Sequence, residues 1–170
     1  MLTIFYDIMP FFEDNYRRIS VREYARIRKI TPPTASKLLT CYHKEGLIRR
    51  EEDRNYIFYS ADNESPLFIH LSRAYWNVCL EKAGLKDYLE KELISPLVIL
   101  FGSFSKAEIK KDSDIDLAVF TASQNSINME HFEKKLNRKI HIFRFRNRDD
   151  IKNPGLLNNI LKGVILTGDW

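Results

Sequence analysis

The sequence predicts an α+β protein whose helices and strands are segregated along the chain. Helical hydrophobic spacing fills most of residues 4–44, and two short strand-like segments follow between residues 47 and 59. Further on, Leu97–Phe101 and Leu117–Phe120 are uninterrupted apolar runs with the length and polar flanks of buried strands. A chain of 170 residues with 44% apolar residues can form one medium domain or two small ones, and these separate patterns favour two.

We expect a first domain over residues 1–62, a helical linker over residues 63–94 and a second domain over residues 95–170. The first boundary rests on the turn-forming residues from Asn63 to Pro66. No apolar run approaches the roughly 18 residues of a membrane span, and the first residues lack the basic segment of a signal peptide. We therefore expect a cytoplasmic protein with no membrane partner.

Three helices are predicted before residue 46. The first covers the apolar residues from Ile4 to Phe12, and Pro10 is expected to kink or end it. The stretch Ser20-Val-Arg-Glu23 matches a capping box and begins the second helix. Thr31 suits the start of the third helix, whose apolar residues recur at i, i+3, i+4 and i+7: Ala35, Leu38, Leu39 and Tyr42.

A hairpin follows the third helix, which Gly46 is expected to end. Residues 47–50 and 56–59 predict two strands around a loop over Glu51–Asn55. This order of three helices and a basic hairpin resembles the winged helix-turn-helix family of DNA-binding domains. The resemblance implies that the third helix enters the major groove of DNA. Winged helices also serve as protein-interaction or dimerisation modules, and that alternative stays open.

Basic residues are concentrated in this first domain. From Arg17 to Arg50 the chain carries ten Lys or Arg residues and two acidic ones. By the same resemblance, phosphate contacts are expected from six side chains: Arg22, Lys37, Lys44, Arg49, Arg50 and Arg54. Thr34 and Ser36 are expected to touch base edges, although small polar side chains specify sequence weakly. The acidic residues Glu51–Asp53 at the tip of the hairpin oppose deep insertion into a groove.

The second domain is organised around residues 97–120. Gly102-Ser103 ends the first apolar run, and ten residues later Asp114-Ile115-Asp116 opens the second. Gly102 permits a sharp turn, and a helix beginning at Ser103 would present amides that attract phosphate. In a strand, Asp114 and Asp116 face the same side, and two converging carboxylates suit Mg²⁺ or Mn²⁺. Either half alone is commonly just a turn or a cap, but the two together predict a nucleotide site.

This pattern resembles the signature of the nucleotidyltransferase superfamily that includes polymerase beta, in particular its minimal nucleotidyltransferase domains. The resemblance covers about residues 93–170 and implies a mixed sheet flanked by helices. It implies nucleotidyl transfer in which Asp114 and Asp116 are the catalytic residues and hold two Mg²⁺ ions, or Mn²⁺ in their place. Gly102, Ser103 and Ser113 would bind the phosphates of a nucleoside triphosphate, with ATP expected.

Two residues depart from the pattern of that superfamily. Ala107 stands where a glycine usually closes the turn after the short helix, and alanine at a position of positive φ costs about 1 kcal/mol or more. His141 stands where the superfamily carries a third carboxylate. A neutral histidine can bind a metal but supplies neither the charge nor the general base of that carboxylate. If its face is not that of Asp114, His141 is a structural residue.

Beyond the motif, we expect a helix over residues 126–137, a strand over 139–145, a helix over 154–162 and a strand over 164–167. Two functional hypotheses remain. In the first, the protein transfers a nucleotide onto a protein or nucleic-acid acceptor, because related minimal domains act as antitoxins that adenylylate a partner protein. In the second, it is a DNA-binding regulator whose nucleotidyltransferase fold senses nucleotide or mediates association. A homodimer would suit a two-fold DNA site.

Overall fold

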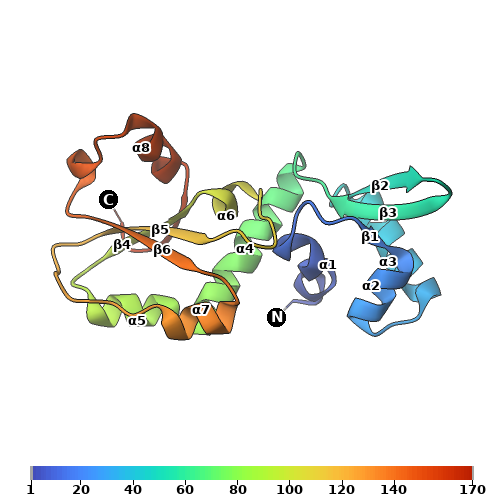
Figure 1. The fold of residues 1–170 in the computed structure, drawn as a ribbon, viewed down its shortest axis with the longest axis horizontal. Helices are drawn as coiled ribbons and strands as arrows, with labels where there is room; N and C mark the ends of the chain where they lie inside the picture. The colour runs from blue at the N-terminus through green and yellow to red at the C-terminus, as the bar shows by residue number, and fades with distance from the viewer. Residues whose placement is uncertain (1, 170) are drawn as a thin grey trace. The chain divides into compact units, whose positions relative to one another are not determined.

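The computed structural model describes residues 2–169 (Figure 1). Contacts divide the chain into two compact units, one of residues 1–72 with 107–111 and the other of residues 73–106 with 112–170. The predicted α+β class is confirmed, since helices accompany two separate sheets. None of the helices within the described residues is both long enough and apolar enough to cross a membrane.

The first unit combines helices with a small antiparallel sheet in the order β1-β3-β2. Its elements are α1 (Thr3–Glu13), β1 (Ile19–Ser20), α2 (Val21–Arg28), α3 (Pro32–Lys44), β2 (Ile48–Asp53) and β3 (Tyr56–Ala61). The capping residue expected for α2 is confirmed, because the Glu23 amide donates to Ser20 Oγ at 3.2 Å. Gly46, with φ of +71°, follows the last residues of α3 as expected.

Helix α1 does not end at Pro10 but continues to Glu13, because an internal proline removes only one helical hydrogen bond and Pro10 is buried in the core. The expectation for the hairpin loop was wrong in detail. The hairpin loop is only Arg54–Asn55, both with positive φ, which is the geometry of a two-residue hairpin turn. The acidic residues 51–53 therefore belong to strand β2. Their charge led to the prediction of a loop, but the side chains of an exposed strand can be charged equally well.

A buried polar network joins the three helices of the first unit. The carboxylate of Asp7 on α1 pairs with Arg28 of α2 at 2.5 Å and accepts a hydrogen bond from the Tyr42 hydroxyl of α3 at 2.7 Å. The Tyr24 hydroxyl donates to the Asp7 backbone carbonyl at 3.0 Å. Burial, with a further contribution from the charge of Asp7, raises the pKa of Tyr24 to about 12. The Tyr24 hydroxyl therefore keeps its proton, and its hydrogen bond to Asp7, at pH values at which an ordinary tyrosine ionises.

The segment Ala107–Lys111 belongs to this unit although it lies between the two halves of the sequence motif. Two hydrogen bonds join Asn15 to Ile109. The backbone amide of Asn15 donates to the Ile109 carbonyl at 2.8 Å, and the side-chain oxygen of Asn15 accepts from the Ile109 backbone amide at 2.5 Å. Both residues are buried. Ala107 has φ of +56°, which confirms the strained conformation expected where related sequences carry glycine.

The second unit is built on a four-stranded sheet in the order β6-β5-β4-β7. Its elements are the greater part of α4 (Pro66–Ala83), then α5 (Leu85–Glu92), β4 (Leu97–Phe101), α6 (Ser103–Lys106), β5 (Ile115–Phe120), α7 (Glu130–Leu136), β6 (Ile140–Phe145), the short 3-10 helix η1 (Arg148–Asp150), α8 (Pro154–Leu161) and β7 (Val164–Thr167). Strands β5 and β6 are parallel and the other pairs are antiparallel, so the mixed sheet implied by the resemblance is confirmed.

Helix α7 begins at Glu130 and not at residue 126 as expected. The preceding polar residues form local turns instead, because their side chains bond to nearby backbone: the Asn125 amide donates to Ser123 Oγ at 3.2 Å and the Glu130 amide to Asn128 Oδ1 at 2.9 Å. The Asn128 amide donates to the Tyr88 hydroxyl on α5 at 2.9 Å, which fixes this turn against a neighbouring helix.

One hydrophobic core of this unit lies on the face of the sheet that α8 covers. Ile160 of α8 packs there against alternate residues of the two central strands: Leu97, Ile99, Phe101, Ala118 and Phe120. Phe143 and Phe145 of β6 extend the same face, while α5 and α7 lie on the other side of the sheet (Figure 1). Because strand residues alternate between faces, Asp116 and His141 continue the α8-covered face beyond its apolar part.

Candidate functional site

The turn after β4 meets the start of β5. Phe101 is paired with Asp116 in the sheet, and Gly102 follows with φ of +70°. A Cβ atom at residue 102 would lie 2.5 Å from Oδ2 of Asp116, so the backbone approaches this carboxylate as closely as only glycine permits. The fold thus brings together the two halves of the motif, which are more than ten residues apart in the sequence.

Helix α6 is held in place behind this turn. Ser105 Oγ donates to the Gly102 carbonyl at 3.0 Å, and the Arg73 side chain donates to the Ser105 carbonyl at 2.5 Å. The Phe104 ring packs edge-on against Trp76 of α4, with centroids 4.6 Å apart. Ser103, the first residue of α6, is half-buried beside Gly102. The turn is therefore rigidly supported, as a phosphate-binding turn requires.

Asp114, Asp116 and His141 converge at the same end of the sheet. Asp114 directly precedes β5, Asp116 is the second residue of β5, and His141 is paired with Asp116 across the parallel β5–β6 ladder. The imidazole lies 3.8 Å from Asp114 Oδ2 through Nε2 and 3.6 Å from Asp116 Oδ1 through Nδ1. The side chains are 41%, 27% and 57% exposed, respectively, so a ligand can reach all three. His141 therefore shares the face of the two aspartates.

Electrostatics at this end of the sheet favour a bound cation. Burial raises the pKa of the Asp116 carboxyl above its ordinary value, and the nearby Asp114 acts in the same direction. The His141 side chain opposes this rise without cancelling it. A cation between the two carboxylates would relieve both their repulsion and the cost of burying the Asp116 charge.

Among residues 2–169, no further carboxylate joins Asp114 and Asp116 beside His141. Glu133 of α7 accepts a hydrogen bond from the Ile140 amide at 2.9 Å and pairs with Lys139 at 3.1 Å, and these contacts lower its pKa. Glu130 is exposed at the start of α7, and Glu108 belongs to the other unit. Within residues 2–169, no group of three or more His, Cys, Asp and Glu side chains is arranged to hold a metal ion.

These donors fit one divalent cation better than two. Mg²⁺ is commonly held by one or two carboxylates while phosphates and water complete its coordination, and Asp114 with Asp116 supplies such a pair. A second cation would need a further carboxylate, and the side chain beside the two aspartates is the imidazole of His141. The site residues therefore suit a cation that arrives with a phosphate-bearing ligand.

Arg138 is a supporting residue that the sequence reasoning missed. Its guanidinium donates to the Ser113 carbonyl at 3.4 Å, directly before Asp114. It also lies over the rings of Trp76 and Phe104, 5.7 and 5.9 Å from their centroids. Arg138 thus contacts the residues next to both halves of the motif. Its position directly before a predicted strand gave no indication of this role.

Comparison with known families agrees with this geometry. The family described as polymerase beta, nucleotidyltransferase, matches residues 84–169, which is just over half of the chain. The chain belongs to the polymerase beta nucleotidyltransferase family. A comparison with curated proteins gave no match. Nucleotidyltransferases of this family use a nucleoside triphosphate and a divalent metal ion, and the match extends over the Gly102 turn, both aspartates and His141.

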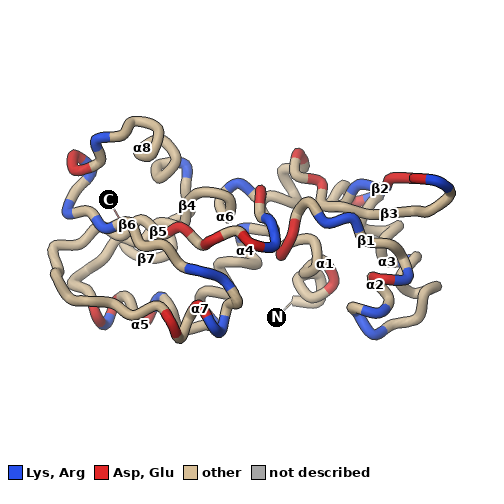
Figure 2. The backbone as a smooth tube through the Cα atoms, viewed as in Figure 1, with Lys and Arg blue, Asp and Glu red and all other residues tan. Residues whose placement is uncertain are grey.

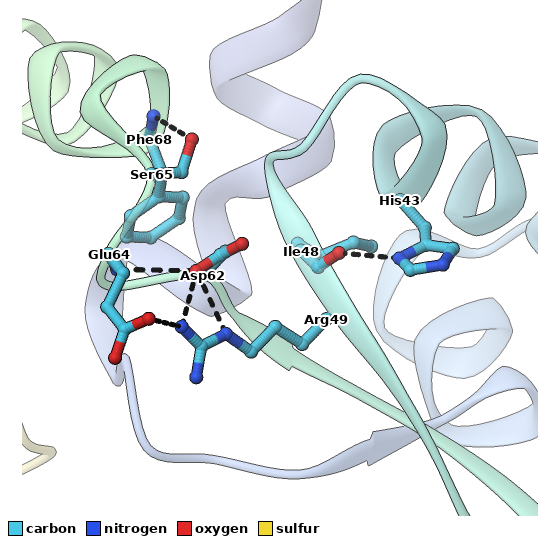
Figure 3. Close-up of polar contacts among 7 residues, drawn as sticks. All are labelled: His43, Ile48, Arg49, Asp62, Glu64, Ser65 and Phe68. Carbon is cyan, nitrogen blue, oxygen red and sulfur yellow. Dashed lines mark hydrogen bonds and ion pairs between the residues drawn. The ribbon is translucent and has the colours of Figure 1, made fainter.

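The nucleotidyltransferase match begins at residue 84, after the three helices and the hairpin of the first unit. In that part of the chain, the structure separates the expected DNA-contacting residues into two groups. Arg49 points from β2 toward two carboxylates, with Asp62 at 2.8 Å and Glu64 at 2.8 Å (Figure 3). Arg50 pairs with Glu52 at 3.5 Å. A phosphate contact from either arginine would have to replace these ion pairs.

The second group is exposed and makes no ion pair with any other described residue: Arg22 on α2, Lys37 and Lys44 on α3, and Arg54 in the hairpin turn. Thr34 and Ser36 are exposed near the beginning of α3, where the Thr34 hydroxyl contacts that of Thr31 at 2.9 Å. Along β2 the acidic residues 51–53 stand out in red, and Arg18 pairs with Glu51 at 3.1 Å and with Asp53 at 3.6 Å (Figure 2). The basic residues that form no ion pair with other described residues therefore lie on α2, on α3 and in the hairpin turn.

Proposed function

We propose that this member of the nucleotidyltransferase family is a DNA-binding regulator whose C-terminal domain binds a Mg²⁺–nucleotide complex and transfers the nucleotide slowly or not at all. The observation that carries the proposal is the place of His141, within 4 Å of both Asp114 and Asp116. By the resemblance, this is the position at which the family has its third carboxylate. A histidine can accept a proton, but it does not supply the negative charge with which a third carboxylate would help to hold a second metal ion. Binding of one Mg²⁺–nucleotide complex does not need that third carboxylate.

In this proposal each half of the motif binds a different part of the ligand. Asp114 and Asp116 would hold Mg²⁺, which neutralises charge on the phosphates and orients them when bound. The Gly102 turn permits close approach of backbone to phosphate, with Ser103 and Ser113 beside it as hydroxyl donors. ATP is the expected nucleotide. The chain's own contribution is to orient the phosphates against the cation.

The second candidate function is nucleotidyl transfer itself, onto a protein or nucleic-acid acceptor, including adenylylation of a partner protein by an antitoxin. It is favoured by the close approach of Gly102 to Asp116, since the phosphate turn and the metal-binding pair are both intact. Asp114 and Asp116 would then be catalytic, acting through the cation on the attacking and leaving oxygens.

The variant His141→Asp separates these candidates. If His141 holds the third carboxylate position, the substitution should tighten Mg²⁺ binding about tenfold, which corresponds to about 1.4 kcal/mol, because it adds a negative ligand beside two others. It should also raise the slow transfer of radiolabelled AMP from ATP. His131→Asp is a matched control, because His131 is an exposed residue of α7. Wild-type transfer as fast as that of the variant would favour the enzyme, and unchanged Mg²⁺ affinity would show that His141 does not hold that position.

For the first unit we propose a winged helix-turn-helix that binds DNA through α3. The exposed Lys37 and Lys44 lie on this helix without ion-pair partners among the described residues, and Thr34 and Ser36 lie near its first turn. Arg22 and Arg54 would contact flanking phosphates. The ion pairs of Arg49 and Arg50 make these two residues the weaker candidates. Two copies in a homodimer would match a two-fold site.

DNA binding of the variant Lys37→Ala/Lys44→Ala tests this proposal. If both lysines neutralise phosphates, affinity for duplex DNA should fall and the slope of log K against log salt concentration should become less steep by about 1.8. Fluorescence anisotropy at several salt concentrations measures both quantities. The control Lys91→Ala/Lys162→Ala removes two exposed lysines of the other unit and should change neither. Equal slopes for the two double variants would remove α3 from the DNA interface.

A further inference from the structure

A pocket separate from the Asp114 and Asp116 site lies in the nucleotidyltransferase unit, at the end of the sheet away from the two aspartates. It has a volume of about 420 Å³ and is lined by Leu97, the first residue of β4, and Phe120, the last residue of β5. Leu97 is paired with Phe120 in the ladder, and Phe101 with Asp116. Four residues of strand, about 13 Å, therefore separate this pocket from the metal-binding pair. It is a distinct site on the same sheet.

Two arginines give the pocket its charge. Arg146 and Arg148, which follow β6, line it, and neither guanidinium forms an ion pair or hydrogen bond with another described residue. The nearby Asp150 accepts hydrogen bonds from the Arg146 and Asn147 amides at 2.9 and 3.3 Å, which shapes the loop. The planar guanidinium fork matches phosphate and carboxylate oxygens. The pair is therefore suited to an anion.

The other lining residues add two different kinds of contact. Ile94, Leu97 and Phe120 form an apolar wall, and the Ile94 side chain is 72% exposed beside it. The carboxylate of Asp169 also lines the pocket and is suited to accept hydrogen bonds from hydroxyl groups. A ligand that satisfies the whole lining has an anionic end, an apolar planar body and hydroxyl donors between them. A nucleoside monophosphate has all three.

The backbone conformation beside the pocket supports a role in ligand binding. Ser95, which lies between Ile94 and Leu97 in the sequence, has φ of +40°, a strained region for a residue with a side chain. The buried Thr121 hydroxyl donates to the Ile94 carbonyl at 3.2 Å and holds the strained turn. Such strain is typical of segments that position a ligand contact. Here it keeps Ile94 at the edge of the pocket.

We propose that this pocket binds a nucleoside monophosphate, with the phosphate on Arg146 and Arg148, the base against Ile94 and Phe120, and the ribose hydroxyls toward Asp169. It is independent of the Mg²⁺ site, and its occupant requires no divalent cation. The sequence gives little sign of it, because the residues that line it come from separated segments of the chain.

Titration calorimetry of the full chain with AMP in the presence of EDTA tests the proposal. We expect saturable binding that weakens at least tenfold in Arg146→Gln/Arg148→Gln and persists in Asp114→Asn/Asp116→Asn. Arg144→Gln is the matched control, since Arg144 bonds to the Asn125 carbonyl and does not line the pocket. Adenosine and inorganic phosphate, tested separately, should each bind more weakly than AMP.

Absence of saturable AMP binding would overturn the proposal, and so would phosphate binding as tight as that of AMP. Loss of AMP binding in the aspartate variant but not in the arginine variant would also overturn it, because that result would place AMP in the Mg²⁺ site. Failure of Mg²⁺–ATP to bind wild-type protein would refute the proposed function and leave the AMP result unaffected.

Discussion

Asp7→Asn should destabilise the first unit by about 3–5 kcal/mol, the cost of leaving one charge of a buried pair without its partner. The Asp7 and Arg28 side chains are only 7% and 8% exposed. Arg28 Nε is already buried without a hydrogen-bond partner, so the guanidinium depends on the Asp7 carboxylate for its compensation. Since α1, α2 and α3 all meet at this carboxylate, the loss should loosen the packing of the three helices.

Urea unfolding followed by circular dichroism measures this effect. The control Glu23→Gln removes a surface pair, because Arg17 and Glu23 are 46% and 27% exposed, and should cost less than about 1 kcal/mol. The double variant Asp7→Leu/Arg28→Met removes both charges and should lose much less stability than Asp7→Asn alone. If Asp7→Asn costs no more than the surface control, the buried pair does not hold these helices together.

Gly102→Ala should abolish most nucleotide binding. Its Cβ would lie 2.5 Å from Asp116 Oδ2, so the carboxylate must move away from the position in which it faces Asp114 and His141. The backbone φ of +70° adds a conformational cost of about 1–2 kcal/mol. We expect the Kd for Mg²⁺–ATP to rise at least tenfold and the melting temperature to fall.

Gly84→Ala separates these two effects. Gly84 has φ of +81° in the same unit, but a Cβ there would meet nothing within 4 Å. This variant should therefore lose similar stability and retain normal nucleotide affinity. Equal nucleotide affinities for the two glycine variants would show that the approach of Gly102 to Asp116 does not shape the binding site.

The elements that sequence predicted well are those in which local pattern and tertiary packing agree. The apolar runs 97–101 and 117–120 lie in strands β4 and β5, because uninterrupted apolar residues have no stable place except between two covered layers. Helix α8 begins at Pro154 as predicted, and the Asn153 side chain accepts hydrogen bonds from the amides of its first turn. The partnership of the Gly-Ser turn with the aspartates was inferred from their spacing, and strand pairing accounts for it.

What sequence could not predict depends on long-range contacts. The Asn15–Ile109 hydrogen bonds join residues 94 positions apart, and no local pattern marks Ala107–Lys111 as part of the first unit. The ion pairs of Arg49 with Asp62 and Glu64 depend on the pairing of β2 with the end of β3, which brings these residues side by side. The contact of His141 with both aspartates needed the parallel register of β5 and β6, which a single strand pattern does not contain.

Titration of Mg²⁺–ATP into the full chain, with and without EDTA, tests the central claim most directly. The titration is made with the variant Arg146→Gln/Arg148→Gln, which removes any signal from the pocket that these arginines line. The decisive comparison adds Asp114→Asn/Asp116→Asn to that variant. The account predicts Mg²⁺-dependent binding in the micromolar range that the aspartate substitutions abolish. Absence of binding, or binding that survives loss of both the cation and the two aspartates, would contradict it.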